Sequence, residues 1–246
     1  MRQVTERASV QLAPNPGPMT LEGTNTWVLR EPGRAGCVVV DPGPLDEGHL
    51  EQVASGVELI VLTHGHDDHS EGAARLAELT GAPVVSLDPV WLTPGAEPVR
   101  DGQVLDVAGL RLAVLTTPGH SADSISLHLT DDDAVLTGDT ILGRGTTVVA
   151  HPDGVLGDYL ESLVRLRELG DAAVLPGHGP ELVSAGRVAT DYLAHRQARL
   201  DQVRAAVAGG ARTPQEVLEV VYADVDRVLW PAAELSVRAQ LRYLDR

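Results

Sequence analysis

Cysteine is almost missing from this chain, and long apolar runs are missing altogether. The single cysteine, Cys37, excludes a disulfide within the chain and fits a reducing compartment. Although 43% of the residues are apolar, no apolar run approaches the roughly eighteen residues that a membrane helix needs. Residues 1–7 also lack the apolar core of a secretory signal. We therefore predict a cytoplasmic protein without a membrane partner.

Basic residues are scarce as well. The chain has 19 Lys and Arg against 35 Asp and Glu, which gives a formal net charge of −16. Because affinity for a phosphate backbone comes chiefly from clustered Lys and Arg, this balance argues against a broad nucleic-acid surface and against DNA as a partner. A local basic groove, or the charge of a bound metal, could still meet a phosphodiester, so single-stranded RNA stays open as a substrate.

A histidine-rich loop is the most informative part of the sequence. It follows the apolar run 59–62, which predicts a buried strand, and it places His64, His66, Asp68 and His69 within six positions. Neutral imidazoles and carboxylates are the donors that hold divalent zinc, iron or manganese. A solvated turn gains nothing from such a cluster, so the spacing predicts a metal loop.

Three further ligand candidates each follow a short apolar segment that predicts a strand. They are His120, Asp139 and His178, each next to a glycine. Small residues let the backbone turn sharply and bring one side chain to the end of a sheet. Three such loops in addition to the first predict one shared site.

The motif 63–69, followed in order by His120, Asp139 and His178, resembles the metallo-β-lactamase superfamily. The resemblance covers roughly residues 1 to 182 and implies an αββα sandwich, with two mixed sheets face to face and helices outside. It also implies a binuclear metal centre, most similar to zinc sites, with iron or manganese as alternatives. One metal would be held by His64, His66 and His120, the other by Asp68, His69 and His178, with Asp139 bridging the two.

The chemistry of such a centre follows from its charges. Two divalent ions bring four positive charges, while Asp68, Asp139 and a bridging hydroxide leave about one, which attracts anionic or polarised substrates. Coordination lowers the pKa of water to about 7, so a hydroxide nucleophile exists at neutral pH without a catalytic serine or cysteine. Asp68 is the residue that the resemblance assigns to proton handling.

The bridging aspartate separates this chain from true zinc β-lactamases, which usually lack it and in one large group use a cysteine ligand. Here Cys37 lies in the apolar run 37–40 and is predicted to be a small core residue. The pattern is therefore more similar to the thioesterase and phosphodiesterase branches of the superfamily.

Strand and helix signals alternate along the chain, and periodicity alone predicts a layered α/β domain. Strands are expected at residues 4–12, 26–29, 37–40, 59–62, 84–85, 103–107, 109–115, 124–129, 134–136 and 173–175. Helices are expected at residues 46–55, 71–79, 158–169, 185–208, from Thr213 onwards and at 231–244. We predict a hydrolase domain at 1–182 and a helical tail at 183–246.

The tail and residues 15–26 resemble the mitochondrial β-lactamase-like endoribonuclease branch, and hydroxyacylglutathione hydrolases share the metal motifs. Residues 242–246 stop where the hairpin of a winged helix is expected to continue. We therefore expect an incomplete winged-helix-like module, which weakens the case for a nucleic-acid role of the tail.

Several other polar residues have two interpretations. Asp41 is either a turn residue or a carboxylate that orients a ligand histidine. Arg144, between two glycines, is either a surface residue or an anion clamp. Helix packing is favoured over substrate contact for His195 and Arg196.

Other residues are expected to have structural roles or to support a ligand. His49, His128 and His151 are predicted to be structural or surface residues, although His151 could face the cleft. Residues 131–133 are predicted to form a solvated turn, and Asp123 and Ser124 could support His120.

The sequence as a whole predicts a binuclear metal-dependent hydrolase of a thioester or ester. The main alternative is an endoribonuclease or phosphodiesterase on single-stranded RNA, and a non-catalytic binding protein on the same fold is the third. Whole-chain resemblance favours RNA, whereas the acidic composition favours a small acyl or anionic substrate. The exact substrate, the native metal and the oligomeric state stay open.

Overall fold

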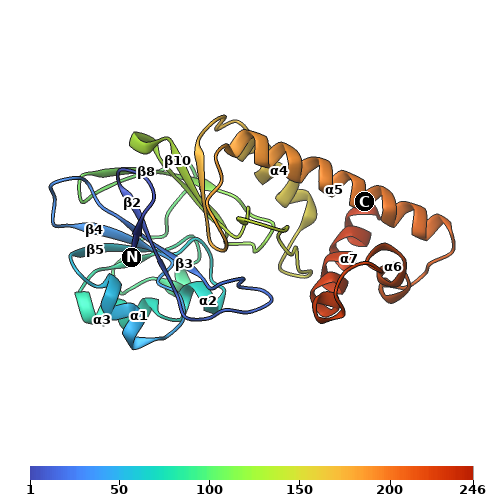
Figure 1. Cartoon of the computed structure of the whole chain (residues 1–246), viewed down its shortest axis with the longest axis horizontal. Helices are drawn as coiled ribbons and strands as arrows, with labels where there is room; N and C mark the ends of the chain where they lie inside the picture. Colours follow the sequence, from blue (N-terminus) through green and yellow to red (C-terminus); the bar gives the residue numbers. More distant parts are fainter. Residues whose placement is uncertain (246) are drawn as a thin grey trace.

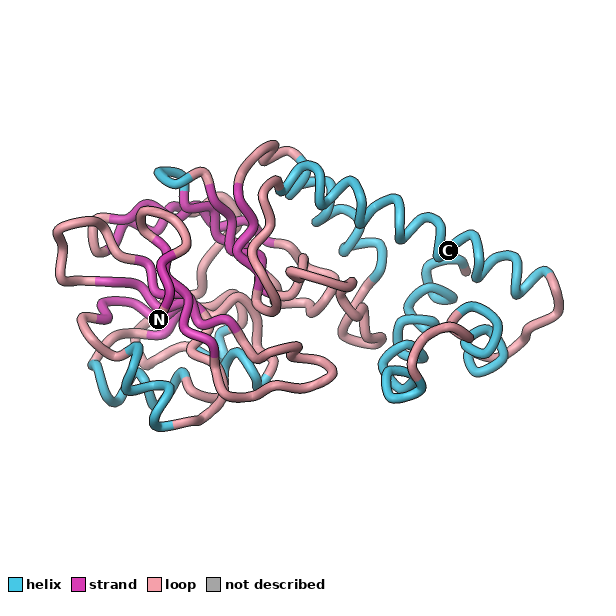
Figure 2. The backbone as a smooth tube through the Cα atoms, viewed as in Figure 1, coloured by secondary structure: helices cyan, strands magenta, loops and turns pink. Residues whose placement is uncertain are grey.

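Two β-sheets pack face to face in the computed structural model, which describes residues 1–245 (Figure 1). Helices lie outside the two layers of strands (Figure 2). The αββα sandwich that the resemblance implied is confirmed. No helix within residues 1–245 is both long enough and apolar enough to cross a membrane.

The sheets have six and five strands. In spatial order the first contains β1 (Arg2–Gln3), β2 (Ala8–Leu12), β3 (Asn25–Leu29), β4 (Cys37–Val40), β5 (Val57–Val61) and β6 (Val84–Val85). The second contains β11 (Ala173–Pro176), β10 (Ala134–Gly138), β9 (Ile125–Leu129), β8 (Leu110–Thr116) and β7 (Val104–Val107). β4, β5 and β6 run parallel, as do β10 and β11, and the other neighbouring pairs are antiparallel.

The helices fall into three groups. Those beside the first sheet are α1 (Glu47–Val53), α2 (Asp67–Ser70) and α3 (Ala73–Thr80). The second sheet is covered by α4 (Leu156–Arg167) and the start of α5 (Ala185–Ala208), and α6 (Pro214–Val221) and α7 (Trp230–Leu244) form the C-terminal module. Short 3-10 turns lie at η1 (Pro89–Trp91), η2 (Thr130–Asp132) and η3 (Arg227–Leu229).

Strand alternation separates the main core from the outer helix layers. In β4, Val38 and Val40 enter the core between the sheets, whereas Cys37 and Val39 face the cluster that contains residues of α1 and α3. Burying each such valine contributes about 1.5–3 kcal/mol relative to leaving it exposed. Cys37 is fully buried, so its prediction as a small core residue is confirmed.

The long helix α5 joins the sandwich to the C-terminal module. Its first half packs on the second sheet through Ala185 and Ala189, and its second half shares a separate apolar cluster with α6 and α7 through Val203. α6 begins with the expected capping box, formed by Thr213 and Glu216. α5 thereby fixes the module beside one end of the sandwich (Figure 1).

Two predicted elements differ from the structure. The strand expected from residue 4 starts at Ala8, because the backbone N–H groups of Val4 and Thr5 both donate to Ala8 O (2.9 and 3.2 Å) and close a turn. The helix expected at 71–79 is α3, which begins two residues later at Ala73, and an additional short helix that was not expected, α2, precedes it and ends at Ser70. The N–H of Gly72 donates to Gly43 O at 2.8 Å, which ties the break to the preceding loop.

The prediction of a fully solvated turn at residues 131–133 is wrong at its centre. The side chain of Asp132 is only 3% exposed and pairs with Arg7 at 2.7 Å, while its other oxygen accepts hydrogen bonds from Arg7 N and Thr5 Oγ1. The carboxylate therefore links η2 to the turn before β2. Asp131 and Asp133 are more accessible, as expected.

Candidate metal centre

The seven candidate ligands come together from four loops at one edge of the two sheets. His64 and His66 lie between β5 and α2, and Asp68 and His69 lie on α2. The remaining three follow β8, β10 and β11, and they are His120, Asp139 and His178. Segments far apart in the sequence thus supply one site.

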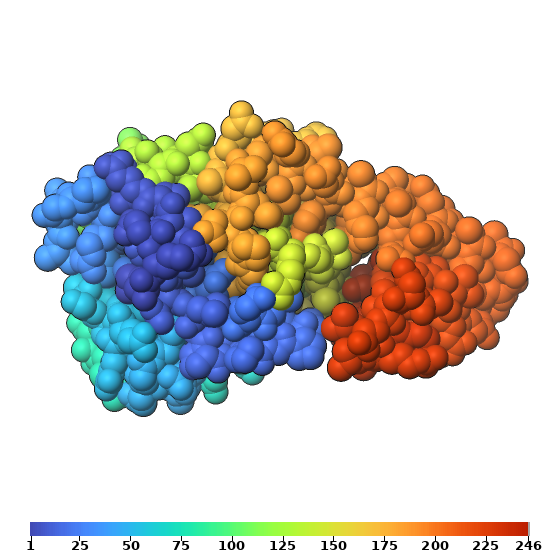
Figure 3. Space-filling view, in the orientation of Figure 1, coloured from blue at the N-terminus to red at the C-terminus, as the bar shows by residue number. Residues whose placement is uncertain are grey.

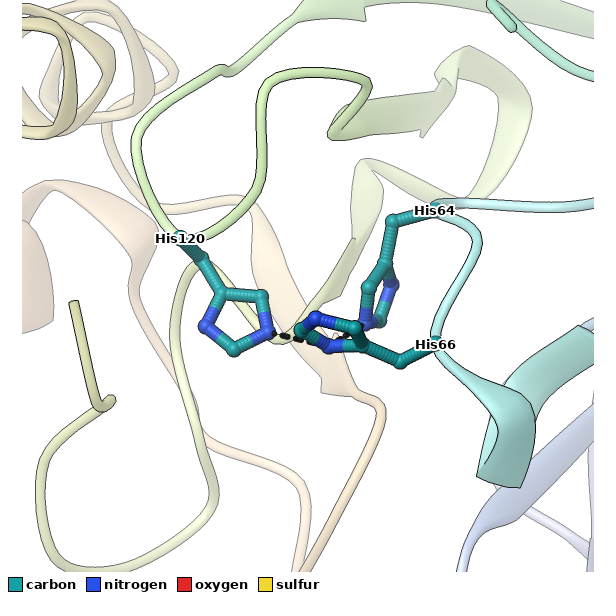
Figure 4. A group of neighbouring side chains, drawn as sticks. All are labelled: His64, His66 and His120. Carbon is teal, nitrogen blue, oxygen red and sulfur yellow. Dashed lines mark hydrogen bonds between the residues drawn. The ribbon is translucent and has the colours of Figure 1, made fainter. Parts of the chain in front are cut away.

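Three histidine rings form the first cluster. The nitrogen His66 Nδ1 lies 3.1 Å from His64 Nε2 and 3.0 Å from His120 Nε2. Figure 4 shows the rings converging, with His64 and His66 on one loop and His120 on another. The three ligand atoms lie within 4.8 Å of one another.

The protons on these rings indicate that a cation belongs between them. His120 Nδ1 lies 2.8 Å from the carbonyl oxygen of Val148, which can only accept, so Nδ1 carries the proton. His64 Nδ1 lies 3.0 Å from Thr63 Oγ1, whose own proton goes to Asp41 Oδ2 at 2.7 Å. In the neutral rings both Nε2 atoms are therefore bare lone pairs. Tetrahedral zinc with bonds of about 2.0–2.1 Å would hold two such nitrogens roughly 3.3 Å apart.

The second cluster has the same character. Asp68 Oδ2 lies 3.1 Å from His178 Nε2 and 3.5 Å from His69 Nε2, and the two histidine nitrogens are 3.2 Å apart. The Nδ1 atom of each ring, on the side away from the cluster, faces an acceptor. His69 Nδ1 lies 2.9 Å from Asp41 Oδ2, and His178 Nδ1 lies 3.2 Å from Gly23 O. This donor set also fits a divalent metal.

Asp139 lies between the clusters. Its carboxylate oxygens are 3.4 Å from His178 Nε2, 3.5 Å from His69 Nε2 and 3.8 Å from His120 Nε2. Oδ1 is buried and has no hydrogen-bond partner. A buried carboxylate oxygen without a partner, between two sets of ligand nitrogens, fits a bridge between two cations.

The electrostatics agree with ligand roles. Burial lowers the pKa of His64 and of His120, which keeps both rings neutral, as coordination requires. Burial opposes the ionisation of Asp139, but His69 and His178 outweigh it and hold the pKa of this carboxyl well below its usual range. The bridge position therefore carries a negative charge at neutral pH.

His178 has the opposite shift. Burial lowers its pKa, but Asp139 and Asp68 more than reverse this effect and raise the pKa to about 10. Without a metal, the carboxylates of the site therefore hold a proton on His178. A divalent cation would take over the role of that positive charge.

Asp41 combines the two roles that the sequence left open. Its backbone φ is 52°, so it occupies a left-handed turn position. Its carboxylate accepts from Thr63 N and Thr63 Oγ1, both at 2.7 Å, and from His69 Nδ1. One buried carboxylate thus orients the start of the metal loop and one of its histidines.

Asn25 positions the His178 loop, a role that the sequence reasoning missed. Its side-chain Nδ2 donates to Pro176 O at 3.0 Å and Gly179 O at 2.8 Å, and its backbone N–H donates to Gly177 O at 2.8 Å. The available signal was a run of polar residues, 24–26, at the start of a strand, where side chains are buried.

Gly177 shows how closely the site is packed. A Cβ at this position would lie 2.5 Å from Asp139 Oδ1 and 2.7 Å from His69 Cε1. Both distances are shorter than van der Waals contact, and neither neighbour is a free flexible end. The glycine that precedes His178 is therefore required by the lack of space beside the bridge.

The loop after Asp139 is held by the helices of the second sheet. Tyr159 OH donates to Thr140 O at 2.8 Å, and the Tyr192 hydroxyl contacts backbone groups of residues 142 and 145. Arg196 is buried and donates to Thr147 O, so its predicted packing role is confirmed.

The other polar candidates do not belong to the two ligand clusters. Arg144 is exposed and pairs with Glu22, and His49 is buried with Nε2 2.9 Å from Thr26 Oγ1. His151 lines a small cavity against α7. Asp123 lies in the His120 loop, where Ser121 Oγ donates to it at 2.7 Å.

Comparisons with known proteins agree over most of the chain. Residues 19–178 match the family model described as Metallo-beta-lactamase superfamily, and residues 213–246 match the model Beta-lactamase associated winged helix domain. A lactamase-like protein, adaB, from Aspergillus niger is 31% identical over 269 residues, covering 95% of this chain and 82% of the relative. A beta-lactamase-like protein 2 homolog from Caenorhabditis elegans is 32% identical over 248 residues, with coverage of 95% and 82%.

Another relative has a specific activity in its name. The atrochrysone carboxyl ACP thioesterase of Aspergillus fumigatus is 32% identical over 236 residues, covering 86% of this chain and 72% of that protein. Among solved structures, the metallo-beta-lactamase family protein TTHA1429 from Thermus thermophilus has a TM-score of 0.82 at 24% identity, with coverage of 97% and 93%. The structure of TTHA1623 in a di-iron-bound form has a TM-score of 0.57 at 26% identity, with coverage of 71% and 94%.

Proposed function

The chain belongs to the metallo-β-lactamase superfamily of hydrolases, and from that premise we propose that it is a binuclear metal-dependent enzyme that hydrolyses a thioester. The resemblance first seen in the metal motifs is thereby confirmed. One observation carries the proposal, namely two trios of ligand atoms with the carboxylate of Asp139 within 3.8 Å of a nitrogen of each trio, and with its buried Oδ1 unpaired. Seven ligands are too many for one tetrahedral ion.

We assign the ligands as the donor sets suggest. One metal would be held by His64, His66 and His120, and the other by Asp68, His69 and His178, with Asp139 between them. Zinc suits imidazole and carboxylate donors, and iron and manganese are the alternatives. The di-iron form of one similar structure supports a site of this type that takes two ions.

The bound ions would supply Lewis acidity and a water molecule of lowered pKa. Asp68 is then the proposed proton carrier. Burial raises the pKa of its carboxyl, but His178 and His69 together outweigh that effect and the pKa is lowered, so the group is ionised at neutral pH. Its side chain is 30% exposed, which leaves it open to solvent and substrate at the edge of the site. The carboxylate can accept a proton from the attacking water and pass it to the leaving thiolate.

A thioester is favoured over the other substrates for two reasons. The named thioesterase shares 32% identity with this chain over 86% of its length. The net charge of −16 disfavours extended contact with a polyanion. The proposed partner is thus a small acyl compound.

Cleavage of single-stranded RNA is the second candidate. The match of residues 213–246 to a winged-helix model favours it, because winged helices are a common nucleic-acid-binding form. It stands below the thioester because the acidic composition gives little support for phosphate contacts.

A parallel assay tests the proposal. The zinc-loaded and manganese-loaded protein is offered a panel of thioesters, a bis-aryl phosphodiester and a single-stranded RNA, with the Asp139→Asn variant as the control for contaminating activity. We expect thioester turnover that chelation abolishes and that the variant largely lacks. Metal-dependent RNA cleavage without thioester turnover would replace the first candidate by the second.

A further inference from the structure

A cleft separates the metal-binding end of the sandwich from the C-terminal module, and we propose that it binds an anionic group at the far end of the substrate. The cleft has a volume of about 310 Å³. Its walls come from residues 18–21, residues 142–148, α5 and the module. Figure 3 shows the hollow between the yellow-green atoms of the loop after Asp139 and the red atoms of the module.

The cleft adjoins the metal centre through two consecutive residues. Thr147 and Val148 both line it. Val148 O accepts the proton of His120 Nδ1 at 2.8 Å, and Thr147 Oγ1 donates to Asp139 O at 2.6 Å. Residues 147–148 therefore lie between the candidate ligands and the cleft, and the proposed substrate would pass this segment on its way from the metals to the anion site.

The wall is mainly apolar, with positively charged groups added. Apolar side chains come from residues 18–21, residues 142–148 and the module, for example Met19, Leu142 and Leu229, whereas α5 contributes polar side chains. The charged groups are Arg144, Arg196 and Arg199; no Asp or Glu lines the cleft among residues 1–245, although Arg144 also pairs with Glu22 just outside it. Acidic residues outnumber basic ones 35 to 19 in the whole chain, so this reversal of charge is local and specific.

Two buried nitrogens in the wall lack hydrogen-bond partners. Arg196 is only 4% exposed, and although it donates to Thr147 O and lies over the Tyr159 ring at 4.9 Å, its Nε has no partner. His195 Nδ1, on the adjacent residue, is also buried and unpaired. Leaving a buried polar group without its hydrogen bond is unfavourable, and more so when the group is charged. An oxygen of a bound anion is the acceptor that would satisfy the guanidinium.

Arg199 extends the positive wall toward the module. Its guanidinium lies 4.3 Å from the centre of the Tyr222 ring and donates to Val221 O. A guanidinium fixed in this way keeps its remaining N–H groups at a defined place and loses little freedom when it binds. The anion site is therefore prearranged by helix packing.

The chemical class of the substrate follows from the volume of the cleft and from the residues that line it. A largely apolar cleft with a few polar groups is the usual form of a small-molecule site, and about 310 Å³ is at the lower end of the usual range. We infer a thioester whose apolar body ends in a carboxylate or a phosphate, on either the acyl group or the thiol. This inference rests on the proposed thioester hydrolysis.

Matched substrates distinguish the two positions of the anion. Glutaryl and 5-methylhexanoyl thioesters of N-acetylcysteamine differ by a carboxylate against an isopropyl group on the acyl side. Acetyl thioesters of 4′-phosphopantetheine and pantetheine differ by a phosphate on the thiol side. In at least one pair we expect the anionic member to have a kcat/KM at least tenfold higher, mainly through KM.

Three variants assign that preference to the cleft. Arg144→Gln and Arg199→Gln should each reduce the preference at least threefold, and Arg199→Lys should restore part of it. Arg204→Gln is the matched control, because Arg204 is exposed on the same helix, pairs with Asp201 and lies outside the cleft. Thermal unfolding of each variant establishes that the module is intact.

A binding measurement separates this inference from the proposed function. Calorimetric titration of the metal-loaded protein with glutarate and with 4′-phosphopantetheine should give weaker binding to Arg144→Gln and Arg199→Gln than to wild type and Arg204→Gln. This result supports the cleft even if no thioester is hydrolysed. If thioesters are hydrolysed with no preference for anionic members and all variants bind the anions equally, the proposed anion site is wrong, while the proposed hydrolase function stands. If only the binding of an RNA oligonucleotide depends on these arginines, the occupant of the cleft is a nucleic acid and not a small anion.

Discussion

Asp41 Oδ2 lies 2.9 Å from His69 Nδ1, and both side chains are buried. The same carboxylate accepts two hydrogen bonds from Thr63, whose hydroxyl in turn faces His64. Asp41 therefore sets the ring orientation and tautomer of one histidine in each cluster, His69 directly and His64 through Thr63.

Removing the negative charge of the Asp41 carboxylate should weaken metal binding. We expect Asp41→Asn to lower metal affinity by about 10–100-fold, the usual effect of losing a group that orients a ligand, while the fold is kept. Competition with a chromophoric chelator measures the affinity, and circular dichroism checks the fold. Asp67→Asn is the control, since Asp67 is exposed at the start of α2 and is not one of the candidate ligands. Equal affinities of the two variants would show that Asp41 is only a turn residue.

Metal content tests the binuclear assignment. After reloading, wild-type protein should contain two metal ions per chain by elemental analysis. Asp139→Ala should contain fewer, because the variant removes the carboxylate between the clusters. A wild-type content of one ion or less would contradict the proposal, as would turnover that survives exhaustive chelation.

Gly177→Ala tests the space beside the bridge. Because the added methyl group would lie 2.5 Å from Asp139 Oδ1, it must displace either the carboxylate or the His178 loop. We expect at least a tenfold loss of turnover and a stability loss of about 1–3 kcal/mol, as is typical of overpacking. Gly48→Ala is the control, because Gly48 lies on α1 and the nearest atom to its new Cβ is 3.6 Å away. Unchanged activity of Gly177→Ala would mean that the loop relaxes freely.

The sequence predicted the candidate ligands because their chemistry depends on residue type and order, and strand ends bring such residues together. It did not predict the role of Asn25, because that role depends on how β3 meets a loop about 150 residues later. The buried carboxylate of Asp132 was missed for the same reason, since its partner Arg7 lies far away in the sequence. The cleft likewise needs α5, the module and the loop after Asp139 to be placed relative to one another.

The Asp132 contact makes a prediction about pH. Burial raises the pKa of its carboxyl, but hydrogen bonds from Thr5 and Arg7 outweigh this and hold the pKa below its usual value. The contact therefore stabilises the fold above the unfolded pKa of about 4, and the stabilisation is lost as the pH falls through the folded pKa.

We expect Asp132→Asn to lower the free energy of unfolding at pH 7 by about 1–3 kcal/mol, the range for loss of hydrogen bonds to a charged group. The difference from wild type should shrink below about pH 4, where the wild-type carboxylate also takes up a proton. Denaturant unfolding of metal-free protein at several pH values measures it. Asp131→Asn, at the exposed neighbouring position, should change stability little at any pH. A difference that is constant down to about pH 2 would show that packing, and not charge, is responsible.

Ionic strength separates the two substrate classes. Binding of single-stranded nucleic acid falls with salt at a slope of about −0.7 per phosphate contact in log–log form, because each contact releases a condensed counterion. A neutral thioester makes no such contacts, so its kcat/KM should change less than about twofold between roughly 50 and 500 mM potassium chloride. An anionic thioester held by the cleft arginines should show an intermediate loss, which Arg144→Gln reduces and Arg204→Gln does not. RNA cleavage that falls steeply over the same range, with a slope that Arg199→Gln makes shallower, would identify a nucleic acid as the occupant of the cleft.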